Sequence, residues 1–167
     1  MSNPKIRIIV EGFGEMCAEL YPDVAPITVK NFMELVRSNF FDGLIFHRVI
    51  NGFMIQGGGY TPDFEQKEAK SIKGEFRANG FKNDLKHEKG VLSMARTSAP
   101  NSASSQFFIM HARAPHLDGQ YAAFGKVYEG LDVVDKIANV ETTIKMWMYQ
   151  DCPRRDVVIK TIEEIKE

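Results

Sequence analysis

The sequence predicts a mainly-β fold, either a barrel or a sandwich, with two short helices added to it. Three observations indicate this class. About eight short runs carry the β-branched, aromatic or alternating residues that are typical of strands. Two other runs repeat their apolar residues at helical spacing. The chain has 167 residues, which at roughly 150 residues per domain predicts a single domain, 1–167.

The first two predicted strands lie at the start of the chain. Residues 5–10 (KIRIIV) are rich in β-branched residues, and residues 15–20 (EMCAEL) alternate strictly. This alternation places Met16, Ala18 and Leu20 on one face. Because a glycine-containing turn separates the two runs, they predict a β-hairpin.

The first predicted helix begins at Pro26. Proline is favourable at the first helical position, where its missing N–H leaves no intrahelical bond unmade. Four apolar residues follow at the spacing of one helix face: Val29, Phe32, Met33 and Val36.

The middle of the chain contains four more predicted strands. Two of them, residues 44–50 (LIFHRVI) and 53–56 (FMIQ), come before the three glycines 57–59. Residues 60–90 are polar and rich in turn signals, so they predict a long loop region. The other two strands, residues 91–95 (VLSMA) and 106–110 (QFFIM), lie on either side of a polar loop.

The C-terminal part predicts two strands and the second helix. Residues 121–128 (YAAFGKVY) and 157–162 (VVIKTI) have strand character. Residues 131–138 (LDVVDKIA) fit a short helix whose predicted buried side consists of Val133, Val134, Ile137 and Ala138.

Composition excludes several classes of protein. The chain has 22 acidic and 21 basic residues, a net charge of −1, whereas a nucleic-acid-binding protein usually has a basic excess. Two cysteines are too few for a disulfide framework and lack the spacing of a metal site. The sequence shows neither a signal-peptide pattern nor 18 consecutive apolar residues. We therefore expect a cytoplasmic protein that binds neither nucleic acid nor a membrane.

Some predicted strand faces mix apolar and polar side chains. The sets that share a face are Gln106 with Phe108, Met54 with Gln56, and Arg48 with Phe46 and Ile50. A core face would be uniformly apolar, so these faces favour a half-apolar groove with a few directed donors, as in a ligand site. The alternative is an ordinary barrel exterior with scattered aromatic residues.

Other catalytic patterns find little support. A pair of His47 with Ser104 or Ser105 lacks the GxSxG turn of a hydrolase. His111 and His116 have neither HExxH nor zinc-ribbon spacing. The glycine run after FMIQ is not followed by GK[ST], so it does not predict a phosphate loop. We expect no metal and no cofactor.

Longer motifs resemble one known family. The run FFDGLIFHRVINGFMIQGGG (40–59) closely resembles the signature of the cyclophilin-type peptidyl-prolyl cis-trans isomerases. Further matches follow the family in order along the whole chain: APITVKNF (25–32), GVLSMAR (90–96), PNSASSQFFI (100–109), LDGQYAAFGKV (117–127) and GLDVVDKI (130–137). The resemblance implies a closed eight-stranded antiparallel β-barrel capped by two α-helices, with the active groove outside the barrel.

The resemblance also implies an activity and a set of site residues. Rotation about an X–Pro bond needs no nucleophile, metal or cofactor, only stabilisation of the twisted amide. Arg48 is implied as the catalytic guanidinium, and Gln56 as the group that binds the substrate and orients Arg48. His47 is implied to be structural, a buried and hydrogen-bonded histidine. The residues implied to line the proline pocket or the peptide groove are Phe53, Met54, Ala95, Arg96 (through its backbone), Gln106, Phe108, His116, Leu117 and Tyr121.

Three positions depart from the pattern of many eukaryotic cyclophilins. His116 stands where those members have the tryptophan that contributes to binding cyclosporin, so we expect only weak cyclosporin binding. Tyr121 replaces a histidine, and Gly59 replaces an aspartate. The loop 96–105 resembles prokaryotic members, and residues 60–72 are the least family-like.

The sequence therefore predicts a monomeric peptidyl-prolyl isomerase that acts on proline-containing peptides and on unfolded or flexible protein segments. Two alternatives remain. One is a non-catalytic module or chaperone that captures proline peptides without turnover, and the other is a structural subunit of a larger assembly.

Overall fold

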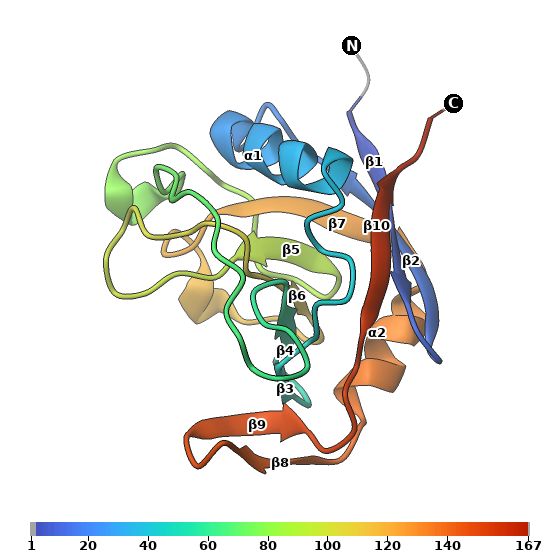
Figure 1. Ribbon diagram of the computed structural model, residues 1–167. Helices are drawn as coiled ribbons and strands as arrows, with labels where there is room; N and C mark the ends of the chain where they lie inside the picture. The colour runs from blue at the N-terminus through green and yellow to red at the C-terminus, as the bar shows by residue number, and fades with distance from the viewer. Residues whose placement is uncertain (1–2, 167) are drawn as a thin grey trace.

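Eight strands form one antiparallel sheet in the computed structural model, which describes residues 3–166 (Figure 1). Along the sheet the strand order is β10-β1-β2-β7-β5-β6-β4-β3. Their bounds are β1 Lys5–Val10, β2 Gly14–Leu20, β3 Arg48–Ile50, β4 Met54–Gly57, β5 Val91–Met94, β6 Phe107–Met110, β7 Ala123–Glu129 and β10 Ile159–Glu164. All eight correspond to predicted strands.

The sheet curls into a half-barrel whose two outer strands, β3 and β10, do not pair with each other. The segments just before these strands meet instead. The amide of Gly43 donates to the carbonyl of Ile159 at 2.8 Å, and the amide of Phe46 donates to the carbonyl of Val157 at 2.9 Å. The expectation of an eight-stranded antiparallel sheet is confirmed, whereas the ladder of strands is open where a closed barrel was expected.

The main core fills the inside of the curl. Along β4 and β6, every second side chain belongs to it: Ile55, Phe107 and Ile109. The ring of Phe107 meets that of Phe32 edge-on, with centroids 5.3 Å apart. The alternation predicted from the sequence therefore gives one fully apolar face to these strands, and it leaves their other face outside the barrel.

Two α-helices cover the ends of the curled sheet: α1 (Pro26–Arg37) and α2 (Leu131–Ala138) (Figure 1). The predicted buried side of each helix is confirmed, because all eight of the residues named for these sides lie in the core. Gly130 precedes α2 with a positive φ of 96°, and a Cβ there would overlap the backbone of Glu15. Glycine therefore lets the chain turn tightly from β7 into the helix.

The N-terminus of α1 is capped from a distant part of the chain. Ala25, at the N-cap, offers no side-chain acceptor. The buried carboxylate of Glu75 instead accepts from the Thr28 amide and the Thr28 hydroxyl, both at 2.7 Å, and from the Ile27 amide at 3.2 Å. An anion at this end also complements the helix dipole. The loop after β4 is therefore tied to the first helix.

Besides the open ladder, two segments differ from the sequence predictions. β3 begins only at Arg48, and Phe46, expected on the face of Arg48, lies in the main core. The alternation fails because residues 45–47 leave the strand ladder to meet residues 157–159. The second difference is a hairpin that the sequence analysis did not predict, formed by β8 (Thr142–Lys145) and β9 (Tyr149–Pro153).

The remaining segments are short or irregular. The predicted loop region 60–90 contains the single 3-10 turn η1 (Arg77–Asn79), and η2 (Pro115–Leu117) lies before β7. Within residues 3–166, no helix is both long enough and apolar enough to cross a membrane.

Removing the distant cap should destabilise the fold. Glu75→Ala leaves the buried Thr28 hydroxyl and two helix amides without their acceptor, so we expect a loss of about 2–3 kcal/mol in the free energy of unfolding. Urea unfolding followed by circular dichroism measures it. Glu68→Ala, at an exposed position of the same loop region, is the control and should change stability by less than about 0.5 kcal/mol. Equal effects of the two changes would contradict this role of Glu75.

Candidate active site

Three neighbouring strands align the polar residues of the site. In the register of the sheet, Arg48 of β3 lies opposite Gln56 of β4, and Gln56 lies opposite Phe108 of β6. The Arg48 guanidinium makes a long contact of 3.5 Å with the Gln56 amide oxygen. The Gln56 amide nitrogen donates to the Gln106 side-chain oxygen at 3.1 Å. The exposed guanidinium is thus held at one end of a row of polar groups.

A second apolar cluster lies on the outer face of these strands, separate from the main core. It contains Met54, Phe108 and Leu117, with Phe53, Ala95 and Tyr121 packed against it. Since Met54 and Phe108 alternate with the core residues Ile55 and Phe107, strand geometry alone places them outside the barrel. Of the residues on the predicted mixed faces, Arg48, Met54, Gln56 and Phe108 line a pocket, whereas Phe46 lies in the main core.

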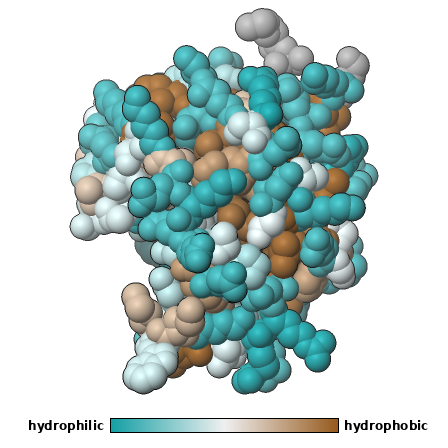
Figure 2. Space-filling model, in the orientation of Figure 1, coloured by the Kyte–Doolittle hydropathy of each residue, from teal (hydrophilic) through white to brown (hydrophobic). Residues whose placement is uncertain are grey.

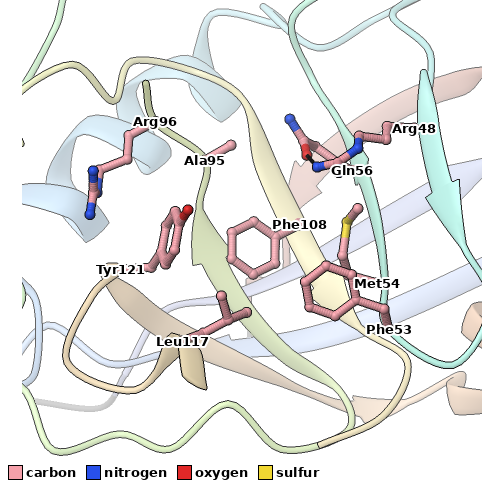
Figure 3. Close-up of a pocket in the computed structure, with 9 residues that line it drawn as sticks. All are labelled: Arg48, Phe53, Met54, Gln56, Ala95, Arg96, Phe108, Leu117 and Tyr121. Atoms are coloured by element: carbon pink, nitrogen blue, oxygen red, sulfur yellow. Dashed lines mark hydrogen bonds between the residues drawn. The ribbon is translucent and has the colours of Figure 1, made fainter. Parts of the chain in front are cut away.

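This pocket has a volume of about 120 Å³ (Figure 3). Figure 3 shows the ring of Phe108 at its centre, with Arg48 and Gln56 on one side and Tyr121 on the other. The Tyr121 ring meets the Phe108 ring edge-on, with centroids 5.7 Å apart. Nine of the residues named from the sequence line the pocket together: Arg48, Phe53, Met54, Gln56, Ala95, Arg96, Phe108, Leu117 and Tyr121.

The other two predicted site residues lie beside this pocket. His116 is exposed in η2, and its ring lies 5.7 Å from the ring of Phe53, which makes it part of the rim. Gln106 lines a neighbouring hollow of about 160 Å³, which shares Gln56, Ala95 and Arg96 with the first. The two hollows therefore form a continuous groove.

Gln106 also gives a reason for the glycine at position 59. A Cβ on Gly59 would overlap the Gln106 side chain as it stands. In this chain a larger residue at position 59 would have to displace that side chain, whose oxygen accepts the hydrogen bond from the Gln56 amide nitrogen.

Arg96 has a different environment from Arg48. Its guanidinium lies between two rings, 4.6 Å from the centroid of Phe76 and 4.8 Å from that of Tyr121. It also donates to the carbonyl of Gln120 at 2.7 Å and to the carbonyl of Thr97 at 2.9 Å. The Arg96 side chain is thus engaged in holding the wall of the pocket.

His47, next to Arg48, is buried, and burial together with the neighbouring Arg48 charge lowers its pKa to about 4. Its ring lies 4.7 Å from that of Tyr60. The buried position agrees with the expected structural role. The expected hydrogen bond is not seen at Nδ1, which has no partner within the described residues. A neutral imidazole at pH 7 places no second charge beside the guanidinium.

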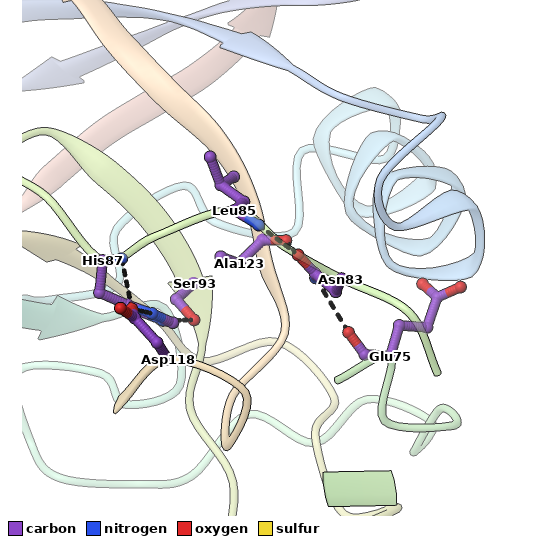
Figure 4. Close-up of polar contacts among 7 residues, drawn as sticks. All are labelled: Glu75, Asn83, Leu85, His87, Ser93, Asp118 and Ala123. Carbon is purple, nitrogen blue, oxygen red and sulfur yellow. Dashed lines mark hydrogen bonds and ion pairs between the residues drawn. The ribbon is translucent and has the colours of Figure 1, made fainter. Parts of the chain in front are cut away.

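A buried polar network around His87, shown in Figure 4, was not predicted from the sequence. The His87 ring lies 2.8 Å from the Ser93 hydroxyl through Nε2 and 3.0 Å from Asp118 through Nδ1. It stacks under the Phe108 ring, with centroids 6.1 Å apart. Because Ser93 is fully buried, this Ser-His-Asp set supports the pocket floor and does not reach a substrate. The only sequence signal was a serine within the apolar run VLSMA.

The site residues of the described chain do not form a metal-binding group: among residues 3–166, no cluster of three or more His, Cys, Asp or Glu side chains could hold an ion. Chemically, the groove offers an apolar floor for a small ring and a fixed cationic donor at its edge.

Comparison with known proteins identifies the family. The family model described as "Cyclophilin type peptidyl-prolyl cis-trans isomerase/CLD" matches residues 5–164. The chain belongs to this family. The cyclophilin resemblance and the isomerase class predicted from the sequence are thereby confirmed.

Curated relatives are similar in sequence along most of the chain. This cyclophilin is 46% identical to peptidyl-prolyl cis-trans isomerase B of Escherichia coli, over 89% of the chain and 93% of that relative. It is 47% identical to a peptidyl-prolyl cis-trans isomerase of Acinetobacter baylyi, over 90% of the chain and 80% of the relative. A solved cyclophilin-type isomerase of Cryptosporidium parvum superposes with a TM-score of 0.85 at 30% identity, with 99% of each chain covered.

The low pKa of His47 should make stability depend on pH. The folded pKa of about 4 lies below the ordinary value of 6.5, so protonation favours the unfolded chain. The stabilisation is fully present above pH 6.5 and is lost as pH falls through 4; the difference corresponds to about 3 kcal/mol. In His47→Gln, the decrease in unfolding free energy between pH 7 and pH 4.5 should therefore be about 2–3 kcal/mol smaller than in the wild type.

Urea unfolding at a series of pH values provides this measurement. His116→Gln, at an exposed histidine, is the matched control and should keep the wild-type pH dependence. The other buried histidine, His87, is present in all three proteins and cancels in the comparison. Parallel curves for wild type and His47→Gln would show that His47 does not titrate as described.

Proposed function

We propose that this cyclophilin isomerises X–Pro bonds by holding the proline ring against Phe108 while Arg48 stabilises the twisted amide. The observation that carries the proposal is the position of Arg48, an exposed guanidinium at the edge of a small apolar pocket. A volume of about 120 Å³ suits a small ring better than an extended side chain.

The physical requirement of the reaction fits such a site. Rotation about the X–Pro bond must break amide resonance, with a barrier of about 18–20 kcal/mol. In the twisted state the proline nitrogen regains its lone pair and becomes a hydrogen-bond acceptor. A donor that is stronger toward this nitrogen than toward either planar form lowers the barrier. Arginine is suited to this role because it stays protonated at all physiological pH values.

The other residues are proposed to position the reacting groups. Gln56 keeps the Arg48 guanidinium in place and binds the substrate backbone, while Gln106 orients Gln56. The apolar contact with the proline ring is assigned to Phe53, Met54, Phe108, Leu117 and Tyr121. Ala95 and the backbone of Arg96 border the chain before the proline, where the second hollow begins.

The proposed substrates are proline-containing peptides and flexible protein segments. A Cryptosporidium parvum cyclophilin-type isomerase whose crystals were studied in the presence of the dipeptide Ala-Pro superposes on this chain with a TM-score of 0.83 at 31% identity. This likeness supports the proposed substrate class.

We also propose that residues 1–167 work as a monomeric single domain in the cytoplasm. The match of the family model to residues 5–164 supports the single domain. We further propose that the half-barrel closes through residues 43–46 and 157–159, which the backbone hydrogen bonds between these segments support.

The alternative function is a non-catalytic module or chaperone that captures proline peptides in the same pocket. It predicts binding without acceleration of the cis-trans exchange. The proposed isomerase function predicts binding of the peptide together with acceleration of its cis-trans exchange.

Replacing the proposed donor should remove most of the rate. Arg48→Ala is expected to lower kcat/KM for a short X–Pro peptide by about 10²–10³, the usual cost of losing one transition-state donor. Arg48→Lys keeps the positive charge but lacks the planar guanidinium, so its kcat/KM should lie between those of the wild type and Arg48→Ala. Arg37→Ala, at an exposed arginine on α1, is the control. A protease-coupled assay measures the rates. Near-normal turnover of Arg48→Ala would show that another group is the donor.

Cyclosporin binding should respond to position 116. His116 lies at the rim beside Phe53, and an indole there adds apolar contact area and an N–H donor. His116→Trp is therefore expected to tighten cyclosporin binding by about tenfold, measured by isothermal titration calorimetry. Ile27→Trp on α1 serves as the control for an added exposed indole. Unchanged affinity of His116→Trp would mean that residues outside this position limit binding.

A further inference from the structure

The hairpin β8–β9 carries an unusual group of exposed apolar side chains. Ile144 is 61% exposed, Met146 55%, Trp147 99% and Met148 70%. The other exposed large apolar residues of the described chain are less exposed: Ile27 is 43%, Tyr128 50% and Leu131 37% exposed. Isolated exposed apolar residues are ordinary, whereas a contiguous group marks an interaction site. Figure 2 shows pale and tan side chains over the hairpin, which projects from a mostly hydrophilic surface.

The turn at the tip of this hairpin is chemically unusual. Met146 and Trp147 both have positive φ, 50° and 69°, and the Met148 amide donates to the Lys145 carbonyl at 3.2 Å. Hairpin turns with two positive φ values are normally built from asparagine and glycine, which adopt them with little strain. Here two large apolar residues occupy both positions, and the turn presents them to solvent.

The hairpin contacts the strand that carries Arg48. β9 lies alongside β3, the strand that carries Arg48 (Figure 1). Half-buried rings connect the two places. Tyr149 of β9 stacks on Phe64 at 4.7 Å and meets Tyr60 at 5.5 Å, and Tyr60 in turn meets His47 at 4.7 Å. Half-buried rings therefore fill the space between the hairpin and His47, the neighbour of Arg48 in the sequence.

An open hollow of about 520 Å³ adjoins the tip, lined by Pro62, Asp63, Phe64, Lys145, Met146 and Asp156. Its one cation, Lys145, is paired with Asp156 at 3.1 Å. The exposed tip residues themselves carry no charge. With Asp63 the hollow has two carboxylates and one lysine, an acidic excess. This charge is unfavourable for a nucleic acid or an anionic lipid surface, which require a basic excess, and the uncharged tip favours an apolar partner.

The area available also restricts the partner. At their exposed fractions, four side chains of about 150–250 Å² each offer roughly 400–700 Å². A stable protein–protein interface buries roughly 600–1,000 Å² on each partner, so this patch lies at or below the lower end of that range. Methionine side chains are flexible and polarisable and adapt to apolar surfaces of different shapes. A small adaptable patch of this kind suits transient contact with an extended apolar chain.

We propose that the tip of the β8–β9 hairpin is a second binding site for apolar segments of the polypeptide whose X–Pro bond occupies the catalytic groove. This inference rests on the proposed isomerase function and extends it to non-native protein chains as the substrate class. Binding at the hairpin makes the encounter of the X–Pro bond with the groove intramolecular, which raises its effective concentration without new contacts at the proline.

Binding can be tested without turnover, because Trp147 is the only tryptophan of the chain. The probe is a proline-free peptide with the segment Leu-Val-Leu-Ile between serine and lysine residues. Its addition should shift the emission of the solvent-exposed Trp147 to shorter wavelength. The double variant Met146→Ser/Met148→Ser keeps the fluorophore and should bind at least about fivefold more weakly. Ile27→Ser, at an exposed apolar residue of α1 on the far side of the molecule, should bind normally.

Kinetics then test the coupling to catalysis. A short X–Pro peptide is joined to the same apolar segment through Gly/Ser spacers of about 4, 8 and 12 residues. The reference is the same peptide with serine residues in place of the apolar segment, the serine-tailed peptide. In the wild type, the best spacer should lower KM by about tenfold relative to this reference, with kcat unchanged. Trp147→Ser should abolish this difference and keep the kinetics of the serine-tailed peptide. Ile27→Ser should retain the difference.

Each alternative has its own outcome. Absence of an emission shift, or a tail effect that persists in Trp147→Ser, overturns the proposal. A shift caused only by vesicles of phosphatidylcholine and phosphatidylglycerol assigns the tip to a membrane, and a shift that depends on protein concentration alone assigns it to a second copy. If the tail binds and no peptide is turned over, the isomerase function fails while the hairpin site stands.

Discussion

Side chains alternate between the two faces of β4 and β6, and this alternation separates the main core of the protein from its pocket. One set, Ile55, Phe107 and Ile109, fills the inside of the curled sheet. The intervening residues, including Met54 and Phe108, form the floor of the groove. A shift of one residue in register would exchange core and site, so the packing of the core fixes the orientation of the catalytic face. The core residues on the inner face of β4 and β6 therefore hold in place the strands that carry the pocket.

Polar groups buried behind the groove add a second constraint. His87, Ser93 and Asp118 satisfy one another directly beneath Phe108. A buried network of this kind is costly when one member is removed, because its partners are then left without hydrogen bonds. Its place below the floor explains why a Ser-His-Asp set occurs in a protein whose reaction makes and breaks no covalent bond. The set holds an aromatic ring in position, whereas the exposed guanidinium of Arg48 lies at the edge of the pocket on the outer face.

Much of the fold could be predicted from local patterns. The strands of the main sheet and both helix faces follow from alternation and helical spacing, which depend on neighbours in the sequence. The β8–β9 hairpin was missed because its residues are mostly exposed and its turn, Met146-Trp147, lacks the usual Asn-Gly signal. The prediction that Phe46 shares a face with Arg48 was wrong because its segment pairs with residues 157–159, which are far away in the sequence, and so does not continue the strand.

For the site, alternation alone left two interpretations open, and the family motifs decided between them. Alternation indicates that Gln56 and Phe108 lie outside the core, but it cannot show that they meet Leu117 or Tyr121 from other parts of the chain. The His87 network joins side chains from three separate segments, so it cannot be predicted from the spacing of residues along the sequence. The distant cap of α1 by Glu75 was invisible for the same reason.

Arg48 is proposed to act on the twisted amide and to contribute little to binding the planar forms. NMR exchange spectroscopy and titration of one X–Pro peptide, with wild type and Arg48→Ala, test it most directly. They give the interconversion rate on the enzyme and the separate Kd values of the cis and trans forms. If Arg48 has this role, Arg48→Ala lowers the interconversion rate strongly while both Kd values change by less than about threefold. An unchanged rate on the enzyme, with both Kd values weakened, would contradict it.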